Sequence, residues 1–537
     1  MGRVDMEAEA EKQTPLRRKR PFGRWFRVVF GLIVVVFGYI WLILDHQLQT
    51  QWLLSVVLGL VFFLILLVGW LVTSWRVATL WALLGGGLGY WAFSTYELVD
   101  VTGDLIPIVR KRGETESIGP SRVRPTQERL GVAWESEETP EESRPGFPQF
   151  MGPNRDGVLS GPELAVDWEA QPPEILWRRP IGAAYSGFAV SDEIAVTQEQ
   201  SLENPDEELV SAYQLSTGDL LWKDAIQARY DSRIAGVGPR ATPTISGGVV
   251  FALGAKGSLS ALELSNGAPV WRVDLIADFG AEVPEWGFAS SPLVVGDRVV
   301  VCAGGGEGES TMAFDVETGA VVWSAGDAPA SWSAPMLATL GGETQILMFN
   351  QNGVLAHAIE DGRILWSHPW NPKFPNVSMP LVWDDNTIIL STGYGQGAER
   401  VRVARVEVVE GEPYWKTSSE WKSRRLKCKF GSLFAVDGFL YGLDDGMLTC
   451  IDPETGDRVW KDGRFGHGQA LLVGQRWLWT TESGDLVLVE PDSEGIQEVA
   501  RLPLLEDKTW NPPTVVGSLA LVRNHVEAVA LRLPLEE

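Results

Sequence analysis

Two kinds of hydrophobic pattern divide this chain. Near the N-terminus, three long and almost uncharged apolar runs cover Val28–Leu44, Trp52–Thr73 and Val77–Tyr96. Each run approaches the roughly 20 residues that a helix needs to cross a bilayer, and tryptophans gather toward the run ends as they do at membrane interfaces. The pattern therefore predicts a three-helix membrane anchor over residues 28–96. Buried helices of a soluble domain are the alternative, which the succession of three such runs disfavours.

The segments beside these runs predict how the anchor is oriented. Residues 1–27 contain a cluster of arginines and lysines, and basic segments of this kind stay in the cytoplasm. Three crossings then place everything after Tyr96 outside the cytoplasm. We therefore expect a multi-pass protein of the cytoplasmic (inner) membrane with a periplasmic domain. A cleaved signal peptide is the alternative for the first run, but no small-residue cleavage site follows it.

Residues 97–145 have a different composition from the segments on either side. They are rich in Glu, Arg, Pro, Ser and Thr and contain few apolar positions. Such a segment buries too little apolar surface to offset the entropy lost on ordering. It is predicted to be a largely disordered, acidic linker.

From residue 171 onward the hydrophobic pattern changes to short alternating strands that recur as a repeat. In each clear copy a strand leads to a Thr-Gly turn, and a second strand then ends in Trp, as in Ala212–Trp222, Ala313–Trp323 and Cys450–Trp460. Looser copies end at Trp271, Trp366 and Trp415. Successive tryptophans stand 43 to 52 residues apart, a period that indicates four-stranded β-propeller blades. The recurring Trp is interpreted as packing between blades, with ligand binding as the alternative.

The two ends of the repeat region predict how the ring closes. Ile175–Trp177 reads as a closing strand with no turn before it, and Glu527–Leu531 reads as a penultimate strand with no Trp after it. Together they complete one blade and remove the last open sheet edge. The expected fold is all-β: an eight-bladed propeller of four-stranded antiparallel blades over residues 146–537, preceded by three transmembrane helices.

The repeat resembles the tryptophan-docking motif of pyrroloquinoline quinone (PQQ) propellers over residues 147–537, and the lead-in Phe147–Gly157 resembles the start of many PQQ-like repeat proteins. This quinoprotein-like family includes dehydrogenases that hold PQQ and Ca²⁺ on the propeller axis. It also includes cofactor-free scaffolds, such as the lipoprotein that assists outer-membrane β-barrel assembly. The chain lacks the adjacent cysteine pair and the long insertions of many dehydrogenase members. The resemblance thus implies the fold and leaves both kinds of function open.

Charge and motif content narrow the function classes. Residues 131–537 contain 30 Lys and Arg against 59 Asp and Glu, a net charge of −29. Such a surface repels phosphate backbones, so we expect no nucleic-acid partner. The three cysteines are far apart and the five histidines lack metal-ligand spacing, so neither a disulfide framework nor a zinc site is expected. Serine-hydrolase and nucleotide-binding motifs are also absent from the sequence.

The loops that lead into the innermost strand of each blade are the best candidates for a site, because they surround one mouth of the axial channel. The residues expected there are Tyr185, Arg240, Trp286, Phe288, Trp332, Phe430, His467, Trp510 and Asn511. Aromatic rings and an Arg could stack a planar ligand and pair with its carboxylate. Asp278, Glu282 and Glu285, in the longest such loop, could supply a general base or a Ca²⁺ ligand. Packing that plugs the channel is the alternative.

The sequence therefore favours a membrane-anchored extracytoplasmic propeller that binds a protein or a small ligand. A PQQ-dependent alcohol or sugar dehydrogenase that passes electrons to membrane quinone is the other hypothesis. It would need PQQ and Ca²⁺ as cofactors.

Overall fold

The computed structural model describes residues 91, 94–103, 107–111, 146–232, 235–407 and 413–536. The basic tail and nearly all of the three predicted membrane helices lie outside this part of the chain. Within it, no helix is long and apolar enough to span a membrane. The chain divides into two compact units, residues 1–101 with 106–129 and residues 102–105 with 130–537.

The first unit contains a small sheet where the sequence predicted other structures. β1 (Tyr96–Val101) pairs antiparallel with β2 (Pro107–Lys111). Tyr96 therefore begins a strand, and the start of the predicted linker contains a pair of strands. Both segments contain β-branched and aromatic residues, which favour strands over disorder. The rest of the predicted linker, residues 112–145, lies outside the described residues.

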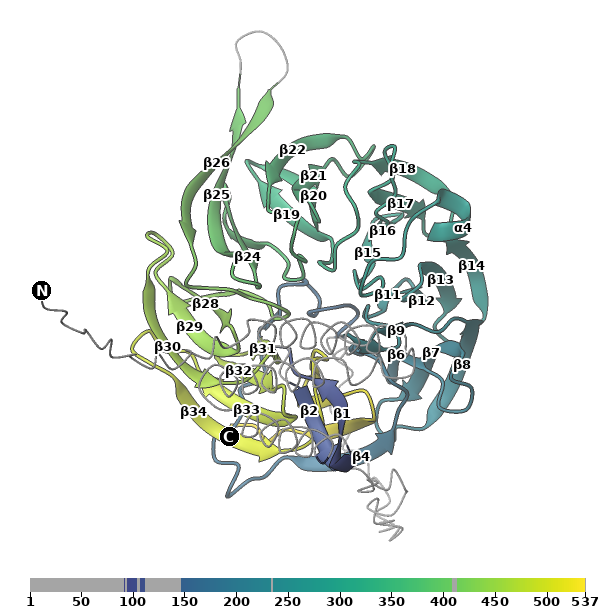
Figure 1. Ribbon diagram of the computed structural model, residues 1–537, viewed down its shortest axis with the longest axis vertical. Helices are drawn as coiled ribbons and strands as arrows, with labels where there is room; N and C mark the ends of the chain where they lie inside the picture. The colour runs from purple at the N-terminus through teal and green to yellow at the C-terminus, as the bar shows by residue number, and fades with distance from the viewer. Residues whose placement is uncertain are drawn as a thin grey trace, which may run out of the picture. The chain divides into compact units, whose positions relative to one another are not determined.

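The second unit is the predicted propeller. Eight sheets stand around an axis, and each contains four antiparallel strands that run from the innermost to the outermost (Figure 1). Blades 1 to 4 consist of β5 (Ala189–Ser191), β6 (Ile194–Gln200), β7 (Glu207–Gln214) and β8 (Leu220–Gln227); β11 (Thr244–Ser246), β12 (Val249–Leu253), β13 (Ser258–Glu263) and β14 (Pro269–Asp274); β15 (Leu293–Val295), β16 (Arg298–Cys302), β17 (Thr311–Asp315) and β18 (Val321–Ala325); β19 (Met336–Leu340), β20 (Glu343–Asn350), β21 (Gly353–His357) and β22 (Ile364–Pro369).

The second half of the ring follows the same plan. Blades 5 to 8 consist of β23 (Leu381–Asp384), β24 (Thr387–Thr392), β25 (Gly397–Val406) and β26 (Tyr414–Ser423); β27 (Phe434–Val436), β28 (Phe439–Asp444), β29 (Met447–Ile451) and β30 (Arg458–Arg464); β31 (Gln469–Val473), β32 (Arg476–Thr480), β33 (Asp485–Glu490) and β34 (Gln497–Pro503); β35 (Thr514–Val516), β36 (Leu519–Arg523), β37 (Glu527–Arg532) and β4 (Glu174–Pro180). Shorter elements are β3 (Val158–Leu159), β9 (Asp231–Ser232), β10 (Gly236–Val237) and α4 (Leu275–Phe279).

The burial of the strands follows from the stacking of the blades. Both faces of a blade are covered by neighbouring blades, so the middle strands are almost continuously buried, as in β12 and β36. The outermost strands have one edge in water, and β14 accordingly alternates exposed and partly buried positions. The hydrophobic core thus lies between the blades, and loops surround the axis.

The ring closes as the sequence predicted. β37, near the C-terminus, pairs antiparallel with β4, and Ala530 lies opposite Trp177. Arg178 also donates a hydrogen bond of 2.5 Å to Glu527, which lies 349 positions away in the sequence. Because of this pairing, blade 8 contains four strands, as do blades 1 to 6.

The recurring tryptophans join neighbouring blades. Nε1 of Trp177 donates a 2.9 Å hydrogen bond to the carbonyl oxygen of Leu215, in the next blade, and Trp222 makes the corresponding 2.8 Å bond to Leu264. The indole of Trp177 lies against the turn glycine Gly218, whose φ is +72°. A Cβ on Gly218 would lie 2.6 Å from that ring. The glycine is therefore needed both for the turn and for the close approach. The interpretation of these tryptophans as packing devices is confirmed.

One tryptophan was assigned wrongly. In blade 5 the sequence spacing indicated Trp415, but Trp421 makes the interblade bond, 2.8 Å from its Nε1 to the carbonyl oxygen of Pro453. Trp421 also lies against Gly456, the turn glycine of blade 6. The reason is the length of the β25–β26 hairpin, whose strands have ten residues each and extend beyond the ring in Figure 1. The extra length places Trp415 outside the position that docks.

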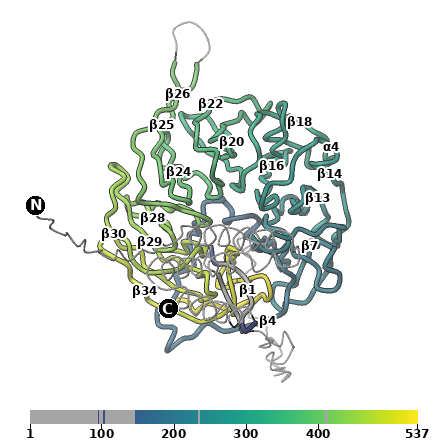
Figure 2. The backbone as a smooth tube through the Cα atoms, viewed as in Figure 1, coloured from purple at the N-terminus to yellow at the C-terminus, as the bar shows by residue number. Residues whose placement is uncertain are grey.

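The lead-in segment passes near the centre of the ring (Figure 2) and contacts three of the blades. Phe147 forms a bridge with Val190 in blade 1, and Val158 pairs in parallel with Leu472 in blade 7. Between them, the buried Arg155 donates hydrogen bonds of 2.8 Å to the carbonyl oxygens of Ser291 and Pro292 in blade 3. Burial lowers the pKa of Arg155 to about 9. Blades far apart in the ring are therefore tied to one short segment on the axis.

Candidate functional site

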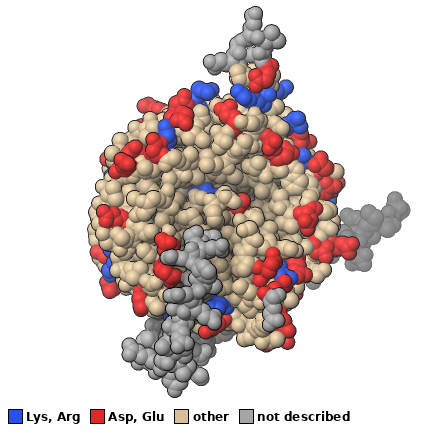
Figure 3. Space-filling model, turned by 180° about the vertical axis from the view of Figure 1, so that it is seen from behind, with Lys and Arg blue, Asp and Glu red and all other residues tan. Residues whose placement is uncertain are grey.

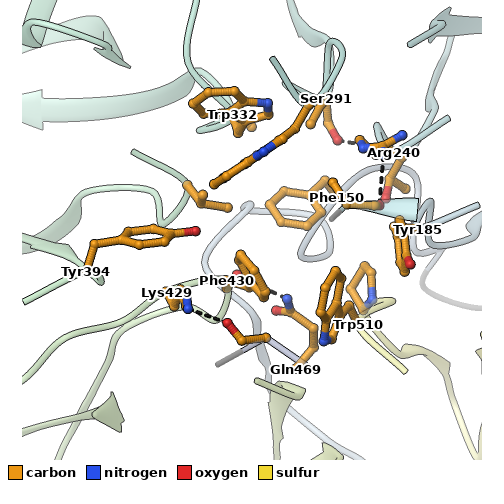
Figure 4. Close-up of a pocket in the computed structure, with 18 of the residues that line it drawn as sticks. Phe150, Tyr185, Arg240, Ser291, Trp332, Tyr394, Lys429, Phe430, Gln469 and Trp510 are labelled. Atoms are coloured by element: carbon orange, nitrogen blue, oxygen red, sulfur yellow. Dashed lines mark hydrogen bonds between the residues drawn. The ribbon is translucent and has the colours of Figure 1, made fainter. Parts of the chain in front are cut away.

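The mouth formed by the entry loops contains a cavity of about 210 Å³. Seven blades contribute to it the residue that stands four positions before their innermost strand. These residues are Tyr185, Arg240, Ala289, Trp332, Val377, Phe430 and Trp510. The repeat thus places equivalent positions around one mouth, as the sequence predicted for its entry loops. Phe150, from the lead-in segment, lies at the centre of the cavity (Figure 4).

Aromatic rings line two sides of the cavity. On one side Trp286 lies between Trp332 and Tyr394, at centroid distances of 4.8 and 6.1 Å. On the other side Trp510 contacts Tyr185 at 5.1 Å and Phe430 at 4.8 Å. Ring pairs at these distances and tilted angles fix one another's orientation. Burial raises the pKa of the Tyr394 phenol, and the nearby charge of Glu285 raises it further, so Tyr394 stays neutral at ordinary pH.

Charged groups stand among these rings. Nζ of Lys429 lies 4.6 Å from the ring centroid of Tyr394, and Nζ of Lys508 lies 4.3 Å from that of Trp510. Opposite charge comes from Glu482, whose Oε1 accepts a 2.9 Å bond from Nε1 of Trp510 and whose Oε2 accepts a 3.1 Å bond from the backbone N–H of His467. Cation–π contacts and hydrogen bonds therefore hold both signs of charge in fixed positions.

Arg240 reaches the mouth but is engaged by the protein itself. Its guanidinium donates to the carbonyl oxygens of Ala235 at 2.8 Å, Gly236 at 2.9 Å and Gly238. It also lies 4.3 Å from the ring centroid of Tyr230. Burial lowers the pKa of Arg240. Through these contacts Arg240 supports the loop before β11. The sequence had predicted a different role for Arg240, the binding of a ligand carboxylate.

Three other predicted residues lie behind the cavity wall. Phe288 is buried in the core between blades, and its neighbour Ala289 takes the lining position. His467 is buried, with its ring 5.4 Å from that of Phe430. Asn511 donates bonds of 3.0 and 2.8 Å to the carbonyl oxygens of Ala184 and Ser186, which positions the loop that carries Tyr185. Phe288 and Asn511 therefore support the mouth without lining it, and the ring of His467 lies against Gly103.

The predicted acidic residues do not form a metal site. Asp278 belongs to helix α4, at the outer rim of the ring in Figure 1, and it is exposed, as are Glu282 and Glu285. Within the described residues, no group of three or more His, Cys, Asp or Glu side chains is placed to hold a metal ion. The aromatic walls offer a stacking surface, but Arg240 is engaged and a Ca²⁺ donor set is lacking there. The residues present do not fit the PQQ and Ca²⁺ pair of the dehydrogenases.

Sequence reasoning missed several lining residues: Phe150, Tyr394, Lys429 and Gln469. Tyr394 comes from the turn between β24 and β25 and not from an entry loop. Its positive φ of 57° marks it as an unusual non-glycine turn residue. Lys429 directly precedes the predicted Phe430, so its position in the repeat was the available signal.

Comparison with known proteins shows which proteins this chain is similar to. A family model described as outer membrane protein assembly factor BamB matches residues 206–499. The outer membrane protein assembly factor BamB of Yersinia pestis is 24% identical over 293 residues, which cover 52% of this chain and 70% of the relative. That of Moranella endobia is 23% identical over 283 residues, covering 50% and 69%. Among solved structures, a quinohemoprotein alcohol dehydrogenase from Pseudomonas putida HK5 aligns with a TM-score of 0.52 at 12% identity, over 73% of this chain and 81% of the other. At that identity the likeness concerns the fold alone.

Proposed function

Because the chain belongs to the family of PQQ-like repeat propellers described as outer membrane protein assembly factor BamB, we propose that its propeller is a protein-binding or scaffold module of the cell envelope. In this proposal the N-terminal apolar runs hold the propeller at the outer face of the inner membrane. Its partner there is another envelope protein. The relatives are named as assembly factors, which supports a role in bringing proteins together.

The observation that carries the proposal is the form of the mouth. The lead-in segment reaches the mouth, and its Phe150 lies at the centre of the cavity. Seven of the nineteen lining residues are aromatic, and rings on each side of the cavity pack against one another. Partly exposed aromatic side chains in a rigid concave surface are typical of the anchoring pockets at protein interfaces.

The charge distribution bears on the class of partner. On the face of the propeller that Figure 3 shows, most Asp, Glu, Lys and Arg side chains lie toward the periphery. The excess of acidic residues disfavours nucleic acid as the partner.

Site-specific photo-crosslinking in native host cells tests the proposal. A photoreactive phenylalanine analogue would replace Trp286 in the mouth or, as a matched control, Leu221, an exposed apolar residue of the outer strand β8. We expect a protein adduct from position 286, identified by mass spectrometry as an envelope protein, and none from position 221. A mouth position without protein adducts, or equal adducts from both positions, would overturn the proposal.

A further inference from the structure

A peptide unit from outside the repeats already lies in the mouth. Thr102 and Gly103 line the cavity and belong to the same compact unit as the propeller. The backbone N–H of Gly103 donates a 2.6 Å hydrogen bond to Oε1 of Glu482. Nζ of Lys429 donates to the carbonyl oxygen of Gly103, the bond drawn beside Lys429 in Figure 4. Both polar groups of one residue's backbone are therefore satisfied by charged side chains of the mouth.

The mouth accepts this backbone only because the residue is glycine. A Cβ on Gly103 would lie 2.1 Å from Cδ2 of His467 and 2.7 Å from its Cγ. The imidazole cannot easily give way, because His467 is 2% exposed and its ring packs against Phe430. Any side chain at this position must therefore displace buried groups.

The two charged groups are positioned by the propeller and not by the glycine. Glu482 is held through Trp510 and the backbone of His467, as described above. Lys429 lies over the ring of Tyr394 and within 5.9 Å of that of Phe430. An acceptor and a donor fixed in this way form a preorganised receptor for the N–H and C=O of one glycine.

We propose that the mouth is a receptor for a glycine-containing turn of a partner protein, and that Thr102–Gly103 is an internal occupant that the partner's turn displaces. This inference rests on the proposed function and adds to it the class of peptide that is recognised. It also makes the segment around Gly103 an autoinhibitory element, because the mouth binds one turn at a time.

A peptide supplied in trans tests the proposal. The probe is a fluorescent peptide with the sequence of residues 98–107, and the receptor is the full chain purified in detergent. The chain with Gly103→Val should bind the probe at least tenfold more tightly than the wild-type chain, because its own segment no longer fits. Adding Lys429→Met to that chain should abolish the gain, whereas Lys373→Met, at an exposed lysine, should leave it unchanged. A probe that carries Val in place of its Gly should not bind.

Two outcomes would overturn the proposal: equal affinity of the wild-type and Gly103→Val chains, or equal binding of the Gly and Val probes. Hydrogen exchange of the unaltered chain gives a second measurement that does not depend on folding of a variant. Excess Gly probe should increase amide exchange around residue 103, and an unchanged rate would also overturn the proposal. If the probe fails while position 286 still crosslinks to an envelope protein, glycine recognition is wrong and the binding function stands.

Discussion

Trp421 and Trp415 offer a test of what the recurring tryptophan contributes to stability. Both belong to β26 and both are partly exposed. Trp421 alone donates the interblade bond to Pro453 and packs on the turn glycine of the next blade. Truncation of a large buried aromatic residue to Ala costs about 3–5 kcal/mol. Since Trp421 is partly exposed, we expect about 3 kcal/mol for Trp421→Ala, of which the lost hydrogen bond contributes about 1 kcal/mol.

The expected change in melting temperature follows from the size of the propeller. Unfolding entropy is about 2.1 cal/mol/K per residue, so a propeller of roughly 390 residues unfolds with about 0.8 kcal/mol/K. Trp421→Ala should then lower the Tm by about 4 °C in differential scanning calorimetry. Trp415→Ala, the matched control on the same strand, should lower it by about 1 °C. An equal or larger loss for Trp415→Ala would refute the docking argument.

Four further predictions concern closure, the mouth, pH and topology. Deletion of residues 524–537 removes β37 and should abolish the cooperative calorimetric transition, because blade 8 loses its third strand. Arg240→Ala should lower the Tm without weakening probe binding to the Gly103→Val chain; a loss of binding at unchanged Tm would restore its predicted role as an anion anchor. Burial raises the pKa of Glu208 from 4.5 to about 7 in the folded chain. Between these two pH values the unfolded chain loses the proton more readily than the folded chain, so the folded state becomes less stable as the pH rises. Glu208→Gln should therefore match the wild-type Tm at pH 4.5 and exceed it at pH 8. An export-dependent reporter fused after Glu537 should be active, and activity of a cytoplasm-only reporter there would contradict the predicted topology.

The sequence could predict the ring because its signals are periodic. A turn glycine and a Trp at a fixed offset specify one blade, and their recurrence specifies the rest, so blade number and closure followed from counting. The offset fails where a blade changes length. In blade 5 the long β25–β26 hairpin moves the docking position from Trp415 to Trp421. A period alone cannot reveal an insertion that keeps a plausible Trp in place.

The site was predicted less completely than the fold, for a geometric reason. Tyr185, Trp332, Phe430 and Trp510 were found because equivalent loop positions project to the same mouth. Phe288 was placed one residue out of register, since entry loops differ in length. Tyr394 was missed because it reaches the cavity from the turn between β24 and β25 instead of from an entry loop. Which groups engage Arg240 depends on carbonyl positions that only the folded loop defines.

The pairing of β4 with β37 also means that the ring can close only late in synthesis of the chain. β4 is among the first parts of the propeller to be made and β37 is the last, with Arg178 and Glu527 separated by 349 positions. Until the final strand is released, β4 keeps an unpaired edge, and seven blades can stack without a closed ring. A chain truncated by a stalled ribosome therefore exposes an open sheet edge, which is a template for aggregation. Only a chain that has been made through β37 can therefore remove that edge.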